Sequence, residues 1–232
     1  MPDLRFSHSG ERDRWTGAGP VRHAGIGDVP TEEHTMAGVI AERPHQADER
    51  GWNEALRTWE QTDAPEGCKV EIIEGIVTVA PPPESDHNDT ADEVQRLLYT
   101  VIPRDWGIYQ TQGLTVPSQQ GLYIPDLAVI PKKLLPRRGE RRMADAAELI
   151  VEITSRSNAN HDRVEKLHGY ADAGVPLYLL LDPWHSGRPT ATLYGQPAGG
   201  VYRVLETVKY GAELHLPAPF DVTVDTALFP GS

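Results

Sequence analysis

Two carboxylates stand inside stretches of sequence that otherwise read as buried β-strands. Asp126 interrupts the apolar run Tyr123–Ile130, and Glu152 lies in the middle of Glu148–Thr154. Burying an unpaired charge is costly, so two such acids lying close together are expected to share a cation. Carboxylate oxygens suit hard cations such as Mg²⁺ or Mn²⁺, which keep several bound waters. The pair predicts a metal site of the kind that polarises a phosphodiester and activates water for its hydrolysis.

A lysine on the following segment would complete this chemistry. The pattern predicts a helix over Asn160–Ala173, on which Asp162, Lys166 and Tyr170 recur every four residues and share one face. If the apolar side of the helix packs on a sheet, Lys166 lies at the edge of that contact and its long stem reaches toward Glu152. There its ammonium would stabilise charge developing in a transition state. We expect Lys166 to be partly exposed, so that its removal costs little stability.

The elements that must position these residues follow from apolar periodicity and turn residues. We expect helices around Trp52–Gln61, from about Ser85 to Val101 and over Asn160–Ala173, and a hairpin at Lys69–Ala80. Further strands are predicted at Tyr109–Val116, Tyr123–Ile130, Glu148–Thr154, Val175–Leu181, Ala191–Tyr194, Val201–Glu206 and Glu213–Leu216. The strand Val175–Leu181 is almost wholly apolar, which is typical of a central strand covered on both faces. This order predicts an α/β fold with a mixed β-sheet flanked by helices.

Composition divides the chain into two parts. Residues 1–47 are rich in Gly, His, Pro and charge without periodicity, and are expected to form a disordered N-terminal tail. Residues 48–232 are expected to form one folded domain. The single cysteine, Cys68, excludes an intrachain disulfide framework and favours a reducing, cytoplasmic location. No apolar run is long enough to span a bilayer, so no membrane association is expected.

The charge balance weighs on the kind of partner. The net charge is −12, an adverse sign for a nucleic-acid partner, because such binding depends on Lys and Arg neutralising phosphates. A basic cluster does lie between the two acid-bearing segments, and its distribution matters more than the total. It is either a solvated loop or a phosphate-contacting patch, and consists of Lys132, Lys133, Arg137, Arg138, Arg141 and Arg142.

Taken in order, these motifs resemble the PD-(D/E)XK restriction-endonuclease-like superfamily, and within it the Uma-type family of restriction endonucleases. The resemblance covers roughly residues 50 to 216 and rests on Pro125-Asp126, Val151–Ser155, Gly174-Val175, Leu181–Pro183 and the face bearing Asp162, Lys166 and Tyr170. The upstream segment Glu71–Val77, a proline-rich stop and His87 at the start of a helix also fit the family.

The resemblance implies roles for particular residues. In the standard superfamily pattern the catalytic lysine lies two residues after the glutamate, where this chain has Thr154, and the family is thought to supply it from the following helix. The roles implied are metal binding by Asp126 and Glu152, catalysis by these two with Lys166, and support by Glu74, His87, Asp162 and Tyr170.

The function implied by the resemblance is a Mg²⁺- or Mn²⁺-dependent endonuclease that hydrolyses DNA phosphodiester bonds, built on a restriction-endonuclease-like α/β core. A homodimer is also implied, because cutting both strands of a duplex suits a twofold assembly. Two alternatives stay open from the sequence. One is a nuclease that acts on RNA, and the other is a nuclease fold without catalysis that serves as a binding or regulatory module.

Overall fold

The computed structural model describes residues 44–135, 137, 139–156 and 158–231, all within one compact unit, Glu42–Ser232. Residues 1–43, most of the segment predicted as a tail, lie outside the described residues. The first helix, α1 (Pro44–Gln61), begins within the predicted tail of residues 1–47, so the last four residues of that tail are helical. The helix ends at Gln61, as predicted.

A six-stranded mixed sheet forms the centre of the fold. Its strands, in spatial order, are β11 (Val201–Lys209), β10 (Thr190–Ala198), β9 (Leu177–Asp182), β8 (Leu149–Ile153), β6 (Leu127–Pro131) and β3 (Trp106–Tyr109). β8 and β9 are parallel, and the other neighbours are antiparallel. All six residues of β9 are buried, as predicted for a central strand covered on both faces.

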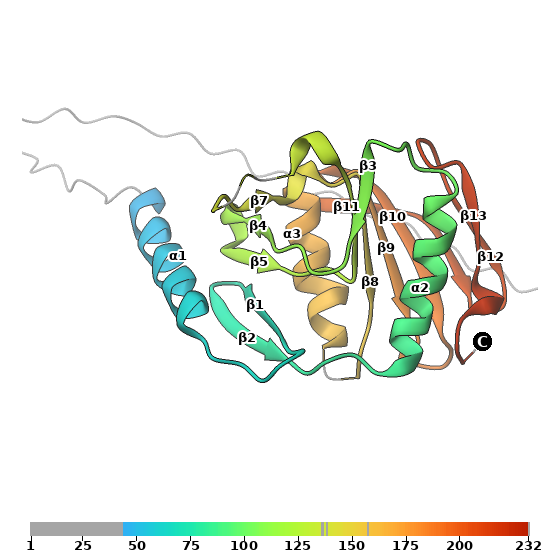
Figure 1. Ribbon diagram of the computed structural model, residues 1–232, viewed down its shortest axis with the longest axis horizontal. Coiled ribbons are helices and arrows are strands. Elements are labelled where there is room, and N and C mark those ends of the chain that lie inside the picture. The colour runs from blue at the N-terminus through green and yellow to red at the C-terminus, as the bar shows by residue number, and fades with distance from the viewer. Residues whose placement is uncertain (1–43, 136, 138, 157, 232) are drawn as a thin grey trace, which may run out of the picture. The chain divides into compact units, whose positions relative to one another are not determined.

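Helices cover both faces of this sheet (Figure 1). Successive side chains of β8 point to opposite faces and so belong to two different hydrophobic cores. Leu149, Val151 and Ile153 pack with α2 (Ser85–Tyr99) and with the small sheet of β12 (Glu213–Leu216) and β13 (Val222–Asp225). Ile150 lies on the other face, in the core that includes Tyr170 of α3 (Lys166–Asp172). Since alternate residues of a strand share a face, Glu152 also lies on the α3 side.

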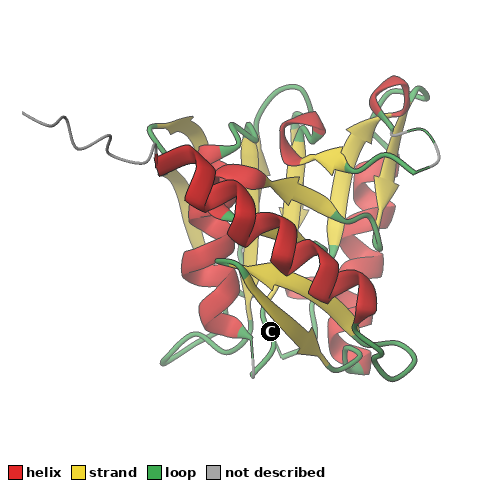
Figure 2. Ribbon diagram, turned by 90° about the vertical axis from the view of Figure 1, so that its left-hand side faces the viewer, coloured by secondary structure: helices red, strands yellow, loops and turns green. Residues whose placement is uncertain are grey.

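The second large sheet lies beyond α3. It has five strands in the order β2 (Ile76–Ala80), β1 (Lys69–Ile73), β5 (Gly121–Tyr123), β4 (Leu114–Val116) and β7 (Arg142–Met143). Figure 2 shows α1 lying across this sheet, where Ala55 and Leu56 pack on Ile72 of β1 and Leu122 of β5. Ile72 of β1 therefore points toward α1, and the residues just before and after it point toward the interior.

Two segments predicted as single strands are divided between the sheets. The predicted strand Tyr109–Val116 splits into β3 and β4, and Tyr123–Ile130 splits into β5 and β6. Asp126 thus lies on the crossover before β6, and its predicted place in the middle of a strand is wrong. Pro125 has no N–H to donate to a ladder and restricts the residue before it, which accounts for the break.

The predicted mixed α/β architecture is confirmed by these layers. The predicted helix over Asn160–Ala173 is also present, as a π-helical turn, η4 (His161–Glu165), that continues directly into α3. Gly174 ends it in the left-handed region, with φ at 78°. Among the residues that the structure describes, no helix combines the length and the apolar character needed to cross a membrane.

Candidate active site

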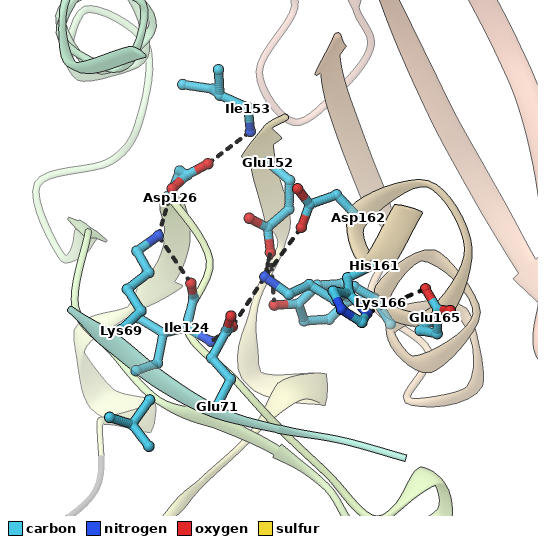
Figure 3. A network of polar contacts seen from close by, with 12 residues as sticks. Lys69, Glu71, Ile124, Asp126, Glu152, Ile153, His161, Asp162, Glu165 and Lys166 are labelled. Atoms are coloured by element: carbon cyan, nitrogen blue, oxygen red, sulfur yellow. Dashed lines mark hydrogen bonds and ion pairs between the residues drawn. The ribbon is translucent and has the colours of Figure 1, made fainter. Parts of the chain in front are cut away.

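Residues predicted to carry chemistry converge on one cavity of about 470 Å³. Asp126, Glu152 and Lys166 all line it, together with Asp162 and His87. Figure 3 shows how Glu152, Asp162 and Lys166 lie relative to one another. They come from four different segments: the β5–β6 crossover, β8, the π-helical turn with the start of α3, and α2. The cavity therefore lies where the chain passes between the two large sheets.

Asp126 is held in place by three donors. Lys69 Nζ lies 2.5 Å from Oδ1, while Oδ2 is 3.0 Å from His87 Nε2 and accepts the Ile153 N–H at 2.7 Å. Leu127 pairs with Val151, so strand β6 begins too late to satisfy Ile153, and the Asp126 carboxylate takes that place in the ladder. Burial raises the pKa of Asp126, but Lys69 and His87 outweigh it and hold the pKa below its ordinary value.

Glu152 sits deeper, with 1% of its surface exposed. Its Oε1 is 3.2 Å from Lys166 Nζ and accepts a longer hydrogen bond of 3.4 Å from the Tyr170 hydroxyl. Burial raises the pKa of Glu152 well above its ordinary value, and the negative charges of Asp162 and Asp126 act in the same direction against Lys166. Burial and the neighbouring acids therefore disfavour the charged form of Glu152.

Lys166 lies at the centre of a carboxylate cluster. Its Nζ is 3.0 Å from Glu71 Oε1, 3.2 Å from Glu152 Oε1 and 3.2 Å from Asp162 Oδ1 (Figure 3). Burial alone would lower the pKa of Lys166, yet the surrounding carboxylates outweigh it and hold the pKa well above its ordinary value. Only 4% of the residue is exposed, so the prediction of a partly exposed lysine at the edge of the helix contact is wrong. An ammonium has three donors, and three carboxylates engage them all.

The π-helical turn η4 places Asp162 against Lys166. Such turns close i→i+5 hydrogen bonds and are mostly found as single turns within α-helices. Asp162 is buried, and the Tyr178 hydroxyl donates a 2.7 Å hydrogen bond to its backbone carbonyl. Burial raises the pKa of Asp162, with Lys166 opposing. Tyr178 of β9 therefore holds this π-helical turn in place.

Tyr170 and Glu74 do not line the cavity. Tyr170 is fully buried behind Glu152, and its ring packs edge-on against Tyr123 at a centroid distance of 5.3 Å. It supports the glutamate from the side away from the cavity. Glu74 is exposed in the turn between β1 and β2, where its φ is 50°. The structure does not bring Glu74 to the site.

Two residues of β1 stand there instead, and sequence reasoning missed both. Lys69 and Glu71 share the interior face of the strand, with Glu71 at 3% exposure. Glu71 Oε1 accepts the Ile124 N–H at 2.6 Å as well as contacting Lys166. The signal in the sequence was the alternation of charged and apolar residues along β1, a pattern that ordinarily marks a solvent-facing strand.

The donor set fits a hard divalent cation. Asp126 and Glu152 offer carboxylate oxygens to the same cavity, and Mg²⁺ accepts one or two carboxylates completed by water and substrate oxygens. Within the described part of the chain, no group of three or more His, Cys, Asp and Glu side chains is arranged to hold a metal. The fit is thus to a two-carboxylate site, at which Lys69 contacts Oδ1 of Asp126.

Comparisons with known proteins bear on the fold and the family. A crystal structure of "a putative nuclease belonging to DUF820" from Anabaena variabilis ATCC 29413 matches with a TM-score of 0.57 and 20% sequence identity, over 77% of this chain and 96% of that one. The likeness shows that the two share a restriction-endonuclease-like fold. A search of curated proteins finds no match.

The family is shown by sequence. The profile of the Uma2 family, described as "Putative restriction endonuclease", matches residues 53–227 and so takes in every cavity-lining residue from Lys69 to Pro189. Because this match spans most of the chain and agrees with the fold, the protein belongs to the Uma2 family.

Proposed function

We propose that this protein is a nuclease that hydrolyses DNA phosphodiester bonds with a divalent metal, Mg²⁺ or Mn²⁺. The observation that carries the proposal is the placement of two buried carboxylates, Asp126 and Glu152, on one cavity that also holds two lysines. Membership of a family described as restriction endonucleases supports the same reaction class.

Asp126 and Glu152 would hold the metal. When bound, such an ion polarises the phosphodiester and lowers the pKa of a bound water. The protein's contribution is to fix the two carboxylates. The Ile153 N–H and His87 orient Asp126, while Tyr170 orients Glu152. The family resemblance and the cavity together make these acids the site's first candidates for substitution.

The two lysines of the cavity divide their roles in this proposal. Lys166 has its three donors engaged by three carboxylates and so acts as their counter-charge, keeping the cluster assembled. Lys69 has 23% of its side chain exposed, and its described contacts, to Asp126 and the Ile124 carbonyl, use two of three donors. We therefore assign the substrate-facing charge to Lys69 and a positioning role to Lys166.

The test is metal binding and cleavage measured side by side. Calorimetric titration with Mg²⁺ should show binding to the wild type that Asp126→Asn and Glu152→Gln each abolish. A labelled oligonucleotide should be cut by the wild type with Mg²⁺, and each variant should lose about 10²-fold or more in rate. Glu213→Gln, an exposed acid on β12, is the matched control and should behave as wild type. Metal binding that survives both substitutions would refute the assignment.

Each alternative function predicts a distinct outcome of these assays. A protein that binds Mg²⁺ and cuts RNA but not DNA would be the ribonuclease considered from the sequence. One that binds nucleic acid without cutting it would be the non-catalytic module. The proposed assembly is a homodimer, which sedimentation at micromolar concentration would reveal as a species of twice the 25.6 kDa chain mass.

A further inference from the structure

The cavity has a second wall that the proposed chemistry does not use. Beyond the carboxylates it is lined by an aromatic ring, by an arginine and by prolines: Trp184, Arg156, Pro81, Pro82, Pro83, Pro183, Pro189 and Pro230. The Arg156 guanidinium lies 4.2 Å from the centroid of the Trp184 ring, a stacked cation–π arrangement. Trp184 nevertheless stays 40% exposed. A large, partly exposed aromatic ring thus lines the cavity together with these prolines.

Trp184 is held in position by the end of β9. The Asp182 carboxylate accepts hydrogen bonds from the Trp184 backbone N–H at 3.2 Å and from the Thr154 hydroxyl at 2.7 Å. Arg163 of η4 binds the same carboxylate with two donors, Nε at 2.8 Å and Nη2 at 2.7 Å. Because Thr154 follows β8 and Arg163 precedes Lys166, this network ties the aromatic wall to the segments that carry the carboxylates.

The charges around the cavity do not suit a duplex. Its lining residues include six acids, among them the exposed Glu84 and Asp86, but only three lysines and arginines, Lys69, Arg156 and Lys166. Binding along a duplex draws on many Lys and Arg contacts to phosphates. The basic cluster between the two acid-bearing segments does not supply them: none of its described members lines the cavity, namely Lys132, Lys133, Arg137, Arg141 and Arg142.

The depth of the site also favours a narrow substrate. Asp126 and Glu152 are 7% and 1% exposed, so a scissile phosphate must enter the cavity to reach them. A volume of about 470 Å³ lies in the range of small-ligand pockets and suits one nucleotide. Single-stranded nucleic acid can present a nucleotide in this way, and aromatic stacking of its bases provides affinity that needs no run of basic residues.

We propose, building on the nuclease function proposed above, that the cavity takes one unpaired nucleotide of a single-stranded substrate, whose base stacks on Trp184. The Arg156 guanidinium, the indole and the base would then form three stacked layers beside the carboxylates. The phosphate of this nucleotide would lie toward Asp126 and Glu152. Single strands, strand ends and unpaired positions are the substrate class.

The experiment measures binding without metal, so that it does not depend on cleavage. Anisotropy of a labelled twelve-nucleotide oligothymidine and of a mixed-sequence duplex of the same length is recorded with EDTA for wild type, Trp184→Ala and Trp184→Phe. Wild type should bind the single strand more tightly. Trp184→Ala should weaken that binding by about 10- to 100-fold, and Trp184→Phe should keep most of it. Tyr99→Ala, an exposed aromatic outside the cavity, is the matched control and should bind as wild type.

The outcomes separate this inference from the proposed function, which is tested by cleavage with Mg²⁺. Equal single-strand binding by wild type and Trp184→Ala, with unfolding curves showing both folded, would overturn the stacking site. Wild type that binds the duplex more tightly than the single strand, or that binds neither in EDTA, would also overturn the stacking site while leaving the nuclease function to the cleavage assay.

Discussion

Replacing Lys166 with methionine should destabilise the metal-free protein strongly. The substitution keeps the buried stem but leaves Glu71, Glu152 and Asp162 around an apolar group, each formerly within 3.2 Å of the ammonium. Removing one partner of a buried ionic cluster costs about 3–5 kcal/mol, since the remaining charges lose their compensation. For a domain of this size each kcal/mol lowers Tm by about 2–4 °C, so a loss of roughly 10 °C is expected.

The pH dependence of this loss has a definite sign. The pKa values of Glu152 and Asp162 are already raised in the folded state, so between their ordinary and raised values the folded protein binds more protons than the unfolded one. Stability linked to these groups is therefore gained as pH falls through that window. Without Lys166 the window widens upward, because a positive charge that lowers both pKa values is gone. The deficit of Lys166→Met should shrink when melting curves are taken at pH 5 instead of pH 7.

Two companion variants make the reasoning refutable. Lys133→Met removes an exposed lysine and should change Tm little. The double variant Lys166→Met with Asp162→Asn removes one of the repelling carboxylates and should recover part of the loss, which a double-mutant cycle would measure. If Lys166→Met melts as wild type at pH 7 in EDTA, the ammonium does not hold the cluster and the reasoning fails.

Two further predictions concern Lys69 and the N-terminal segment. Lys69→Met should lower the stability of the metal-free protein, because Asp126 loses its 2.5 Å partner, yet tighten Mg²⁺ binding about tenfold, because no ammonium competes for that oxygen. Calorimetry showing unchanged or weaker Mg²⁺ binding would refute competition between Lys69 and the metal, whereas Lys69→Arg should resemble wild type. Removing residues 1–43 should leave a single cooperative unfolding transition, since α1 and everything it contacts remain. A broad or absent transition on heating would mean that the removed segment is part of the fold.

Much of the site was predictable because its signals are local. Glu152 stands out as an acid within an apolar strand, and the four-residue spacing of Asp162 and Lys166 places them together on a helix. All three residues line the cavity beside Asp126. Asp126 was identified because the residues around it are apolar, although Pro125 interrupts the single strand that those residues were predicted to form.

What could not be predicted depends on contacts between distant segments. The burial of Lys166 requires acids from β1, β8 and η4 to meet, and no local pattern records that convergence. Glu71 and Lys69 alternate with apolar residues as a solvent-facing strand would, and only the packing of one sheet toward the other turns them inward. The same packing leaves Glu74, three residues after Glu71, in an exposed turn.

The π-helical turn at His161–Glu165 makes this part of the chain sensitive to its exact length. A π turn holds one more residue than an α turn, and each residue of an α-helix advances by about 100°. Deleting one residue there would let the turn tighten into a regular helix and would swing Asp162 and Arg163 around the axis relative to Lys166. The carboxylate cluster and the clamp on Asp182 would be lost together. Among relatives, we therefore expect gaps and insertions in the hairpin turns of this fold but an invariant number of residues between Asp162 and Lys166.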